Sequence, residues 1–195
     1  MSGVNTDLDI DAMLRLQRGE DLALNELMDR WKEPLVSFLV RTISNHRDAV
    51  DIAQETFVRL YQNRKSYHPS GKFSTYLFTI AMRLAKNKIR WRIRHPEIAL
   101  DGQDVDRSDG VKDTLIAHVE SPAEYLLRQE RADEVRQCVA QLPPELRESI
   151  ILYEYHDLSY SEIAEIKSCS IKAVENQLYR ARKQLKMCLW RSSGD

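Results

Sequence analysis

The sequence predicts an all-α protein of two helical domains joined by a flexible acidic linker, with a helix-turn-helix in the C-terminal domain. Apolar residues recur at helical spacing in almost every segment, and no segment shows the sustained alternation of a strand. Residues 97–121 break this pattern, because they include Gly102, Gly110 and several aspartates but few large apolar side chains. We therefore expect an N-terminal domain over residues 1–96, a linker over 97–121 and a C-terminal domain over 122–195.

Composition limits the class of protein. The chain has 195 residues, of which 43% are hydrophobic and 30% charged, so it is long enough to bury two cores. No apolar run approaches the ~18 residues that span a bilayer, and the acidic, polar start does not resemble a signal peptide. The 3 cysteines form no C-x-x-C pair, which argues against a disulfide framework or a zinc knuckle. We expect a cytoplasmic protein without a membrane segment of its own, and we interpret Cys138 as a core residue.

Helix start and stop signals divide the first domain. The expected helices cover residues 8–18, 22–33, 34–43, 48–61 and 74–94. Asp21 and Asp48 are predicted to cap the second and the fourth of these helices, and Pro34 fits the first turn of the third.

The expected helices of the C-terminal domain cover residues 122–142, 145–155, 160–167 and 171–190. Pro143 and Pro144 separate the first two. The last two form a helix-turn-helix, because Ser159 and Glu162 make a capping box at the start of the first and Ser170 can cap the second. The predicted inward residues of the last helix are Val174, Leu178, Ala181 and Leu185.

Charges are segregated along the chain although the formal net charge is only -1. Residues 56–96 contain no Asp or Glu, and their basic side chains are interleaved with aromatic ones. A second basic stretch lies in the last helix, so two separate contacts with a polyanion are expected. Rings beside cations suit unstacked bases, and we predict that Tyr67 and Trp91 are exposed while Phe78 and Ile80 belong to the core.

Three motifs stand in register: DAVDIAQETF at residues 48–57, FSTYLFTIA at 73–81, and LPPELR at 142–147 followed by LSYSEIA at 158–164. Together they resemble the small, two-domain extracytoplasmic-function (ECF) class of bacterial RNA polymerase sigma factors. The resemblance covers nearly the whole chain. It implies a non-catalytic subunit that directs promoter recognition, DNA melting and transcription initiation at a specific regulon.

The resemblance also implies three interfaces. The acidic helix is similar to the surface that docks on the beta-prime clamp helices of core polymerase, with Asp48, Asp51, Gln54, Glu55 and Phe57. The long basic helix is similar to the segment that binds and melts the minus-ten element, with Arg83, Lys86, Asn87, Arg90, Trp91 and Arg94. The last helix is similar to the reader of the minus-thirty-five duplex, with Lys172, Glu175, Asn176 and Tyr179 toward bases and Arg180, Arg182 and Lys183 toward phosphates.

The partners that the resemblance implies are core RNA polymerase, promoter DNA and a cognate anti-sigma factor that holds the free protein inactive by packing against both domains. It implies no catalytic residue, metal or cofactor.

Two other classes of protein compete with this interpretation. A stand-alone helix-turn-helix regulator would account for the C-terminal domain, but not for the first basic stretch or the acidic helix before it. A metal-dependent nuclease could use Asp48, Asp51 and Glu55, which share one helix face. No histidine joins these acids in the sequence, and the 5 histidines of the chain are scattered without ligand spacing.

Overall fold

The computed structural model describes residues 3–95 and 122–192, and every regular element within these two ranges is helical. The first range holds α1 (Gly3–Arg18), α2 (Ala23–Ile43), α3 (His46–Gln62), the short 3-10 helix η1 (Arg64–Ser66) and α4 (Phe73–Arg94). The second holds α6 (Pro122–Ala140), α7 (Pro144–His156), α8 (Tyr160–Lys167) and α9 (Ile171–Ser192). The all-α prediction is confirmed for these ranges, whereas the predicted linker over 97–121 lies outside them. Among the described helices, none has the length and apolar character that crossing a membrane requires.

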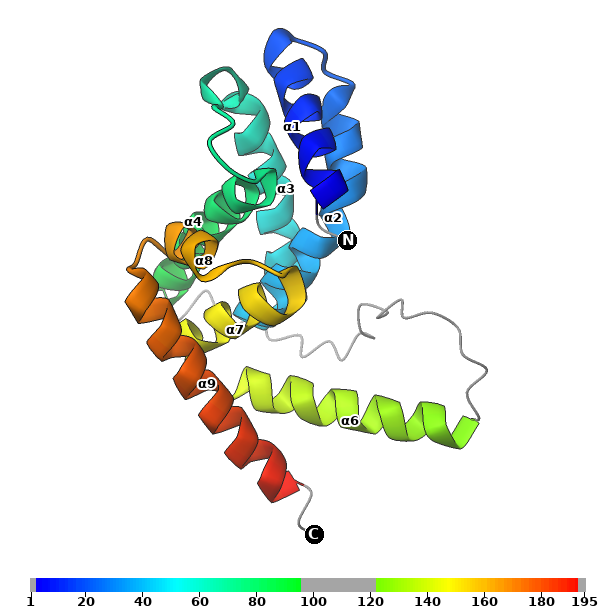
Figure 1. Cartoon of the computed structure of the whole chain (residues 1–195), viewed down its shortest axis with the longest axis vertical. Coiled ribbons are helices and arrows are strands. Elements are labelled where there is room, and N and C mark those ends of the chain that lie inside the picture. Colours follow the sequence, from blue (N-terminus) through cyan, green and yellow to red (C-terminus); the bar gives the residue numbers. More distant parts are fainter. Residues whose placement is uncertain (1–2, 96–121, 193–195) are drawn as a thin grey trace.

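The N-terminal helices pack around an aromatic core. Phe38 of α2 and Phe73 and Phe78 of α4 are fully buried, and the Trp31 ring lies 6.1 Å from Phe73 and 6.0 Å from Phe78 between centroids. Helix α2 packs against both α1 and α3, and α3 packs against α4 (Figure 1). Because the aromatic face of α4 is held inside, its basic face points outward.

The predicted break at Pro34 is wrong. Residues 22–33 and 34–43 belong to one helix, α2, with Pro34 in its interior. The proline removes one backbone donor from the helix. Phe38 and Leu39, just beyond it, are completely buried, and this tertiary packing keeps the helix continuous.

Two predicted caps are also wrong. Helix α3 is capped by Asn45, whose side-chain oxygen accepts from the Asp48 backbone N–H at 2.8 Å, so Asp48 is an inner residue of the first turn. The residue before α2 is Leu22, and no side chain caps that helix, so the Asp21 carboxylate has no capping role. Asn and Asp are both favoured N-cap residues. Asn45 and Asp48 lie three positions apart at the start of α3, so residue type alone does not decide which of them is the cap.

The predicted helix-turn-helix is confirmed. Ser159 Oγ accepts from the Glu162 N–H at 3.3 Å, and a Glu162 carboxylate oxygen accepts from the Ser159 N–H at 2.8 Å, which completes the capping box. Ser170 Oγ accepts from the Ala173 N–H at 3.1 Å at the start of α9. Of the predicted inward residues of α9, Val174, Leu178 and Ala181 are buried and Leu185 packs partly buried against the core.

Helix α6 departs most from expectation. Its last turns are buried, with Cys138 at 2% and Val139 at 7% exposure, but the apolar side chains of Tyr125 and Leu126, nearer its start, face solvent. Cys138 is a core residue as predicted, but it forms a disulfide with Cys188 of α9, which contradicts the prediction against a disulfide framework. A separation of 50 residues carries no pairing signal, and only the fold brings the two Cα atoms to 5.9 Å.

The two domains pack directly on each other, with α8 against α4 and α7 against α2 (Figure 1). The His156 ring, at the end of α7, lies against Phe38 and Phe78 at centroid distances of 5.8 and 4.6 Å. The Arg41 guanidinium of α2 sits 4.3 Å from the Tyr155 ring centroid. An apolar and aromatic seam therefore joins the domains.

Polar contacts frame this seam. The Lys72 ammonium lies 3.1 Å from the Glu162 carboxylate, so the capping-box acid of α8 also holds the residue that precedes α4. Arg147 of α7 donates to the Ser44 hydroxyl at 3.0 Å and to the Thr42 carbonyl at 3.4 Å. These contacts fix α7 and α8 on the N-terminal domain.

We predict that acid weakens this seam through His156. Burial, with a smaller contribution from Arg41, lowers the pKa of His156 from 6.5 to about 4. A released His156 takes up its proton near pH 6.5, whereas the packed one stays neutral, so stability is lost as the pH falls from 6.5 to about 4. The full loss is about 3 kcal/mol. Urea denaturation at pH 7 and pH 5 should show about 2 kcal/mol of this loss, and His156→Phe, which keeps a ring but does not titrate, should remove that part of the pH dependence. An unchanged pH dependence in His156→Phe would contradict the prediction.

Candidate nucleic-acid and protein interfaces

The N-terminal half of α9 presents a polar stripe to solvent. Its opposite side is buried through Val174, Leu178 and Ala181, so the rotation of the helix is fixed. The predicted residues that are exposed on the outer side are Lys172, Glu175, Asn176, Tyr179, Arg180 and Lys183. Amide, phenol and cationic groups on the second helix of a helix-turn-helix can reach base edges and phosphates in a major groove.

Two of these side chains pair with each other. The Lys172 ammonium donates to the Glu175 carboxylate at 2.8 Å, three residues along α9. That hydrogen bond raises the pKa of Lys172. Because both groups are open to solvent, the pair is weak and can exchange for contacts with a ligand.

Arg182 differs from the other predicted cations of α9. Its guanidinium donates to the Glu154 carboxylate of α7 at 3.1 Å and lies 4.9 Å from the Tyr153 ring centroid. Hydrogen bonds to Tyr160 and Glu154 raise the pKa of Arg182. Arg182 is therefore held against α7 and does not belong to the outer stripe that contains Arg180.

A buried lysine supports α9 from within. Lys167 Nζ donates to the Glu145 carbonyl at 2.5 Å, to Ser149 Oγ at 2.7 Å and to Gln177 Oε1 at 2.8 Å, and it lies 3.4 Å from the Glu148 carboxylate. This contact set joins α7, the end of α8 and α9. Sequence reasoning missed it, because a lysine at the end of a short helix is ordinarily a solvated C-terminal charge.

The basic face of α4 forms the second exposed stripe. Arg83, Asn87, Arg90 and Arg94 are all exposed, and their spacing places them along one side of the helix. Lys86 is only half-buried beside this line. Cations and an amide in this arrangement can follow a phosphate backbone.

An aromatic platform adjoins the α4 stripe. Trp91 is 37% exposed, and its ring stacks on His95 at 4.9 Å between centroids with planes 24° apart. The Lys88 ammonium lies 5.6 Å from the Trp91 ring centroid. The predicted exposure of Trp91 is confirmed, and its open ring can accept a stacked base. The predicted exposure of Tyr67 is wrong, since Tyr67 is 4% exposed and packs against Tyr76.

Asp48 lies inside the domain. It is 7% exposed, and its carboxylate pairs with Arg92 at 2.6 Å and with Lys88 at 3.5 Å. These are the two α4 cations that were not among the predicted ligand contacts. Asp48 thus anchors the inner side of α4 and has no free face for a partner in this structure. Phe57, at 4% exposure, likewise belongs to the core.

The outer face of α3 is acidic and open. Asp51 and Gln54 are exposed, and the Glu55 side chain is 45% exposed while it accepts from Arg59 Nε at 2.8 Å. Val58, 47% exposed, extends the same face by one turn. Sequence reasoning missed Val58, although its position seven residues after Asp51 places it on that face.

A nuclease centre has no support in this geometry. Asp48 is committed to two cations of α4, so it does not converge with Asp51 and Glu55 on a shared ion. Over residues 3–95 and 122–192, the structure holds no group of three or more His, Cys, Asp or Glu side chains that could bind a metal.

Comparison with known proteins matches both halves of the chain to sigma-70 families. The model of sigma-70 region 2 matches residues 27–94, and the model of region 4 matches residues 132–185. The RNA polymerase sigma-H factor of Pseudomonas aeruginosa is 31% identical over 176 residues, which cover 90% of each chain. The ECF RNA polymerase sigma-E factor of Haemophilus influenzae is 31% identical over 175 residues, covering 88% of this chain and 89% of that protein.

Two solved structures share the fold. CnrH, in complex with the cytosolic domain of CnrY, matches with a TM-score of 0.66 and 22% identity over 96% of this chain and 99% of that one. The sigma factor RpoE, in complex with the anti-sigma factor NepR from Bartonella quintana, matches with a TM-score of 0.59 and 21% identity over 85% and 95%.

Proposed function

The chain belongs to the ECF-type RNA polymerase sigma factors, and on that premise we propose that its two promoter-reading surfaces are the outer stripes of α4 and α9. A sigma factor of this type initiates transcription and is not an enzyme. We assign residues 1–96 to the domain of region 2, 97–121 to the linker and 122–195 to the domain of region 4.

The observation that carries the proposal is that both stripes are exposed, while three neighbouring cations of α4 and α9 are held by acids. Lys88 and Arg92 are held by Asp48, and Arg182 by Glu154. The cations left on the outer faces are the ones that a polyanion can reach.

On α9 we assign Lys172, Glu175, Asn176 and Tyr179 to base edges of the minus-thirty-five duplex, and Arg180 and Lys183 to its phosphates. Arg182 stays in the assignment as a phosphate contact only if it leaves Glu154. The buried contacts of Lys167 support the assignment, because a rigid recognition helix loses little entropy on binding.

On α4 we assign Arg83, Lys86, Arg90 and Arg94 to the phosphates of the minus-ten strand, with Asn87 beside them. Trp91 supplies the ring on which a base released from the duplex stacks, a contact worth ~1–3 kcal/mol. These contacts would stabilise the single strand that DNA melting releases, and so offset part of the free energy of unpairing.

The exposed face of Asp51, Gln54 and Glu55 is our proposed dock for the clamp helices of the polymerase beta-prime subunit. Acidic and amide groups suit arginines of a partner helix. Asp48 and Phe57, both buried, shape this helix from inside and make no direct contact in our proposal. Since core polymerase is the partner, we infer that the protein acts in the cytoplasm.

The closed packing of the two domains supports control by an anti-sigma factor. Promoter elements at minus ten and minus thirty-five are about 25 base pairs apart, roughly 85 Å of duplex. In this structure the domain that carries α9 packs on α4 through α8, and the axes of packed helices lie only about 10 Å apart. The seam between the domains must therefore open before both promoter elements are bound. The structures of CnrH and RpoE each contain a bound partner protein, and we infer that a cognate anti-sigma factor holds this chain closed.

A crossover experiment tests the two assignments. We expect Arg180→Ala to weaken binding of polymerase holoenzyme to a minus-thirty-five duplex about tenfold, without changing its affinity for a single-stranded minus-ten oligonucleotide. Arg90→Ala should do the reverse. Fluorescence anisotropy measures both affinities, and Arg18→Ala on α1 serves as the exposed-arginine control. If both variants weaken both ligands equally, the cations act only through general charge and the assignment fails.

A further inference from the structure

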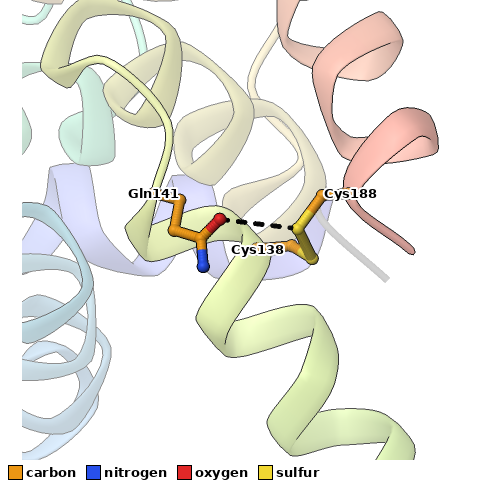
Figure 2. Close-up of a disulfide and its surroundings, with 3 residues drawn as sticks. All are labelled: Cys138, Gln141 and Cys188. Atoms are coloured by element: carbon orange, nitrogen blue, oxygen red, sulfur yellow. Dashed lines mark hydrogen bonds between the residues drawn. A yellow bond between two sulfur atoms is a disulfide. The ribbon is translucent and has the colours of Figure 1, made fainter. Parts of the chain in front are cut away.

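The bridge between Cys138 and Cys188 joins the C-terminal end of α6 to the second half of α9 (Figure 2). Helix α6 packs against α9, and only its C-terminal end is buried. Further back, Tyr125, Leu126 and Leu127 are 48 to 60% exposed, and α6 extends away from the rest of its domain (Figure 1). The bridge is therefore a principal tie of α6.

The two halves of α9 are supported differently. The recognition half is fixed by the buried Val174, Leu178 and Ala181 and by Gln177, which binds Lys167. The second half carries Cys188, and residues on both sides of this cysteine line an apolar pocket against α7; these lining residues include Leu185, Leu189 and Trp190. Trp190 is 78% exposed, so packing contributes less there.

We propose that Cys138 and Cys188 form a reversible thiol–disulfide modification site, whose redox partner is a small thiol of the glutathione class. Oxidation ties α6 to the second half of α9, and reduction releases them, while the N-terminal half of α9 keeps its structure. The inference does not depend on the promoter or polymerase assignments.

Access to the bridge favours attack on Cys188. Cys188 is half-buried, whereas Cys138 is 2% exposed. A glutathione thiolate attacks Cys188 Sγ, the S–S bond breaks, and the departing Cys138 thiolate takes a proton from water. A second glutathione thiolate attacks the mixed disulfide, which releases Cys188 as a thiolate and yields glutathione disulfide. Oxidation of the dithiol is the reverse exchange and consumes glutathione disulfide.

Gln141 is placed to stabilise the reduced form. Its Oε1 lies 3.7 Å from Cys188 Sγ (Figure 2). In the oxidised form the Cys188 sulfur carries no proton, so it makes only a van der Waals contact with Gln141 Oε1. In the reduced form the Cys188 thiol can donate a hydrogen bond to this amide oxygen. The same neighbour therefore serves the dithiol better than the disulfide, which favours an exchangeable bridge.

The test equilibrates the full chain in buffers of stepped glutathione ratio, followed by alkylation and mass analysis of each cysteine. We expect Cys138 and Cys188 to change together, from one-tenth to nine-tenths reduced over roughly a hundredfold change in [GSH]²/[GSSG]. Hydrogen exchange on the same samples should show residues 124–140 exchanging about tenfold faster when reduced, with residues 171–183 unchanged.

Variants separate the bridge from other cysteine chemistry. Cys138→Ser and Cys188→Ser should each reproduce the fast exchange of α6 under oxidising conditions. Cys169→Ser, which removes the free thiol in the turn of the helix-turn-helix, should leave the redox response intact. A bridge that stays closed at every ratio, stays open at every ratio, or changes residues 171–183 as much as α6 overturns the proposal.

Discussion

Reversing the charge of Asp51 and Glu55 together should abolish co-elution of this chain with bacterial core RNA polymerase in size-exclusion chromatography. Both carboxylates lie on the open face of α3, and the Glu55 side chain is 45% exposed. In our proposal they meet arginines of the clamp helices. Asp51→Arg with Glu55→Arg places like charges together, which costs several kcal/mol, so affinity should fall more than about a hundredfold.

The same double variant should fold normally. Glu55 pairs with Arg59 one turn along α3, and an exposed pair of this kind is worth only a few tenths of a kcal/mol. Asp29→Arg with Glu33→Arg is the matched control, because these two exposed acids have the same spacing on α2. If the control loses polymerase equally, net charge explains the effect. If the unaltered chain does not co-elute in the absence of an anti-sigma factor, the polymerase-binding proposal fails.

The helices and the motifs were accessible from the sequence, because they depend on local patterns. Periodicity located α8 and α9, and the spacing of Ser159 and Glu162 predicted a capping box that is present. The outer stripe of α9 followed from the same periodicity, whereas the residues of the α4 stripe were implied by the family resemblance. At Pro34 the local rule failed, since burial of Phe38 and Leu39 keeps α2 intact through the proline.

What escaped prediction depends on contacts between distant segments. Asp48 shares a motif with Asp51, but periodicity does not say how deep a polar residue lies, and Asp48 is buried. The pairing of Cys138 with Cys188 requires α6 to fold back on α9. The seam around His156 joins two domains that charge patterning treats as independent. Each of these features exists only in the assembled fold.

Replacing Lys167 should have the largest effect on stability. Its side chain is 4% exposed, and burial lowers the pKa of Lys167 although the Glu148 carboxylate acts in the opposite direction. Lys167→Met fills the same space but leaves Glu148, with 8% of its side chain exposed, without its cation. It also removes the donor that Ser149 and Gln177 accept from. We expect a loss of about 3–5 kcal/mol in urea denaturation followed by circular dichroism.

The second half of this prediction separates the ion pair from the packing around it. If the cost arises from the carboxylate left behind, Glu148→Gln added to Lys167→Met should recover about 2 kcal/mol or more, because a neutral amide is far cheaper to bury than an unpaired charge. Glu148→Gln alone leaves the Lys167 ammonium with the Glu145 carbonyl as a strong acceptor, so its cost should be smaller than that of Lys167→Met. Additive losses in the double variant would mean that the cost arises from the hydrogen bonds that Lys167 donates, and not from the carboxylate left unpaired. Coupling between the two sites would show that the buried pair of Lys167 and Glu148 stabilises the packing of α8 on α7.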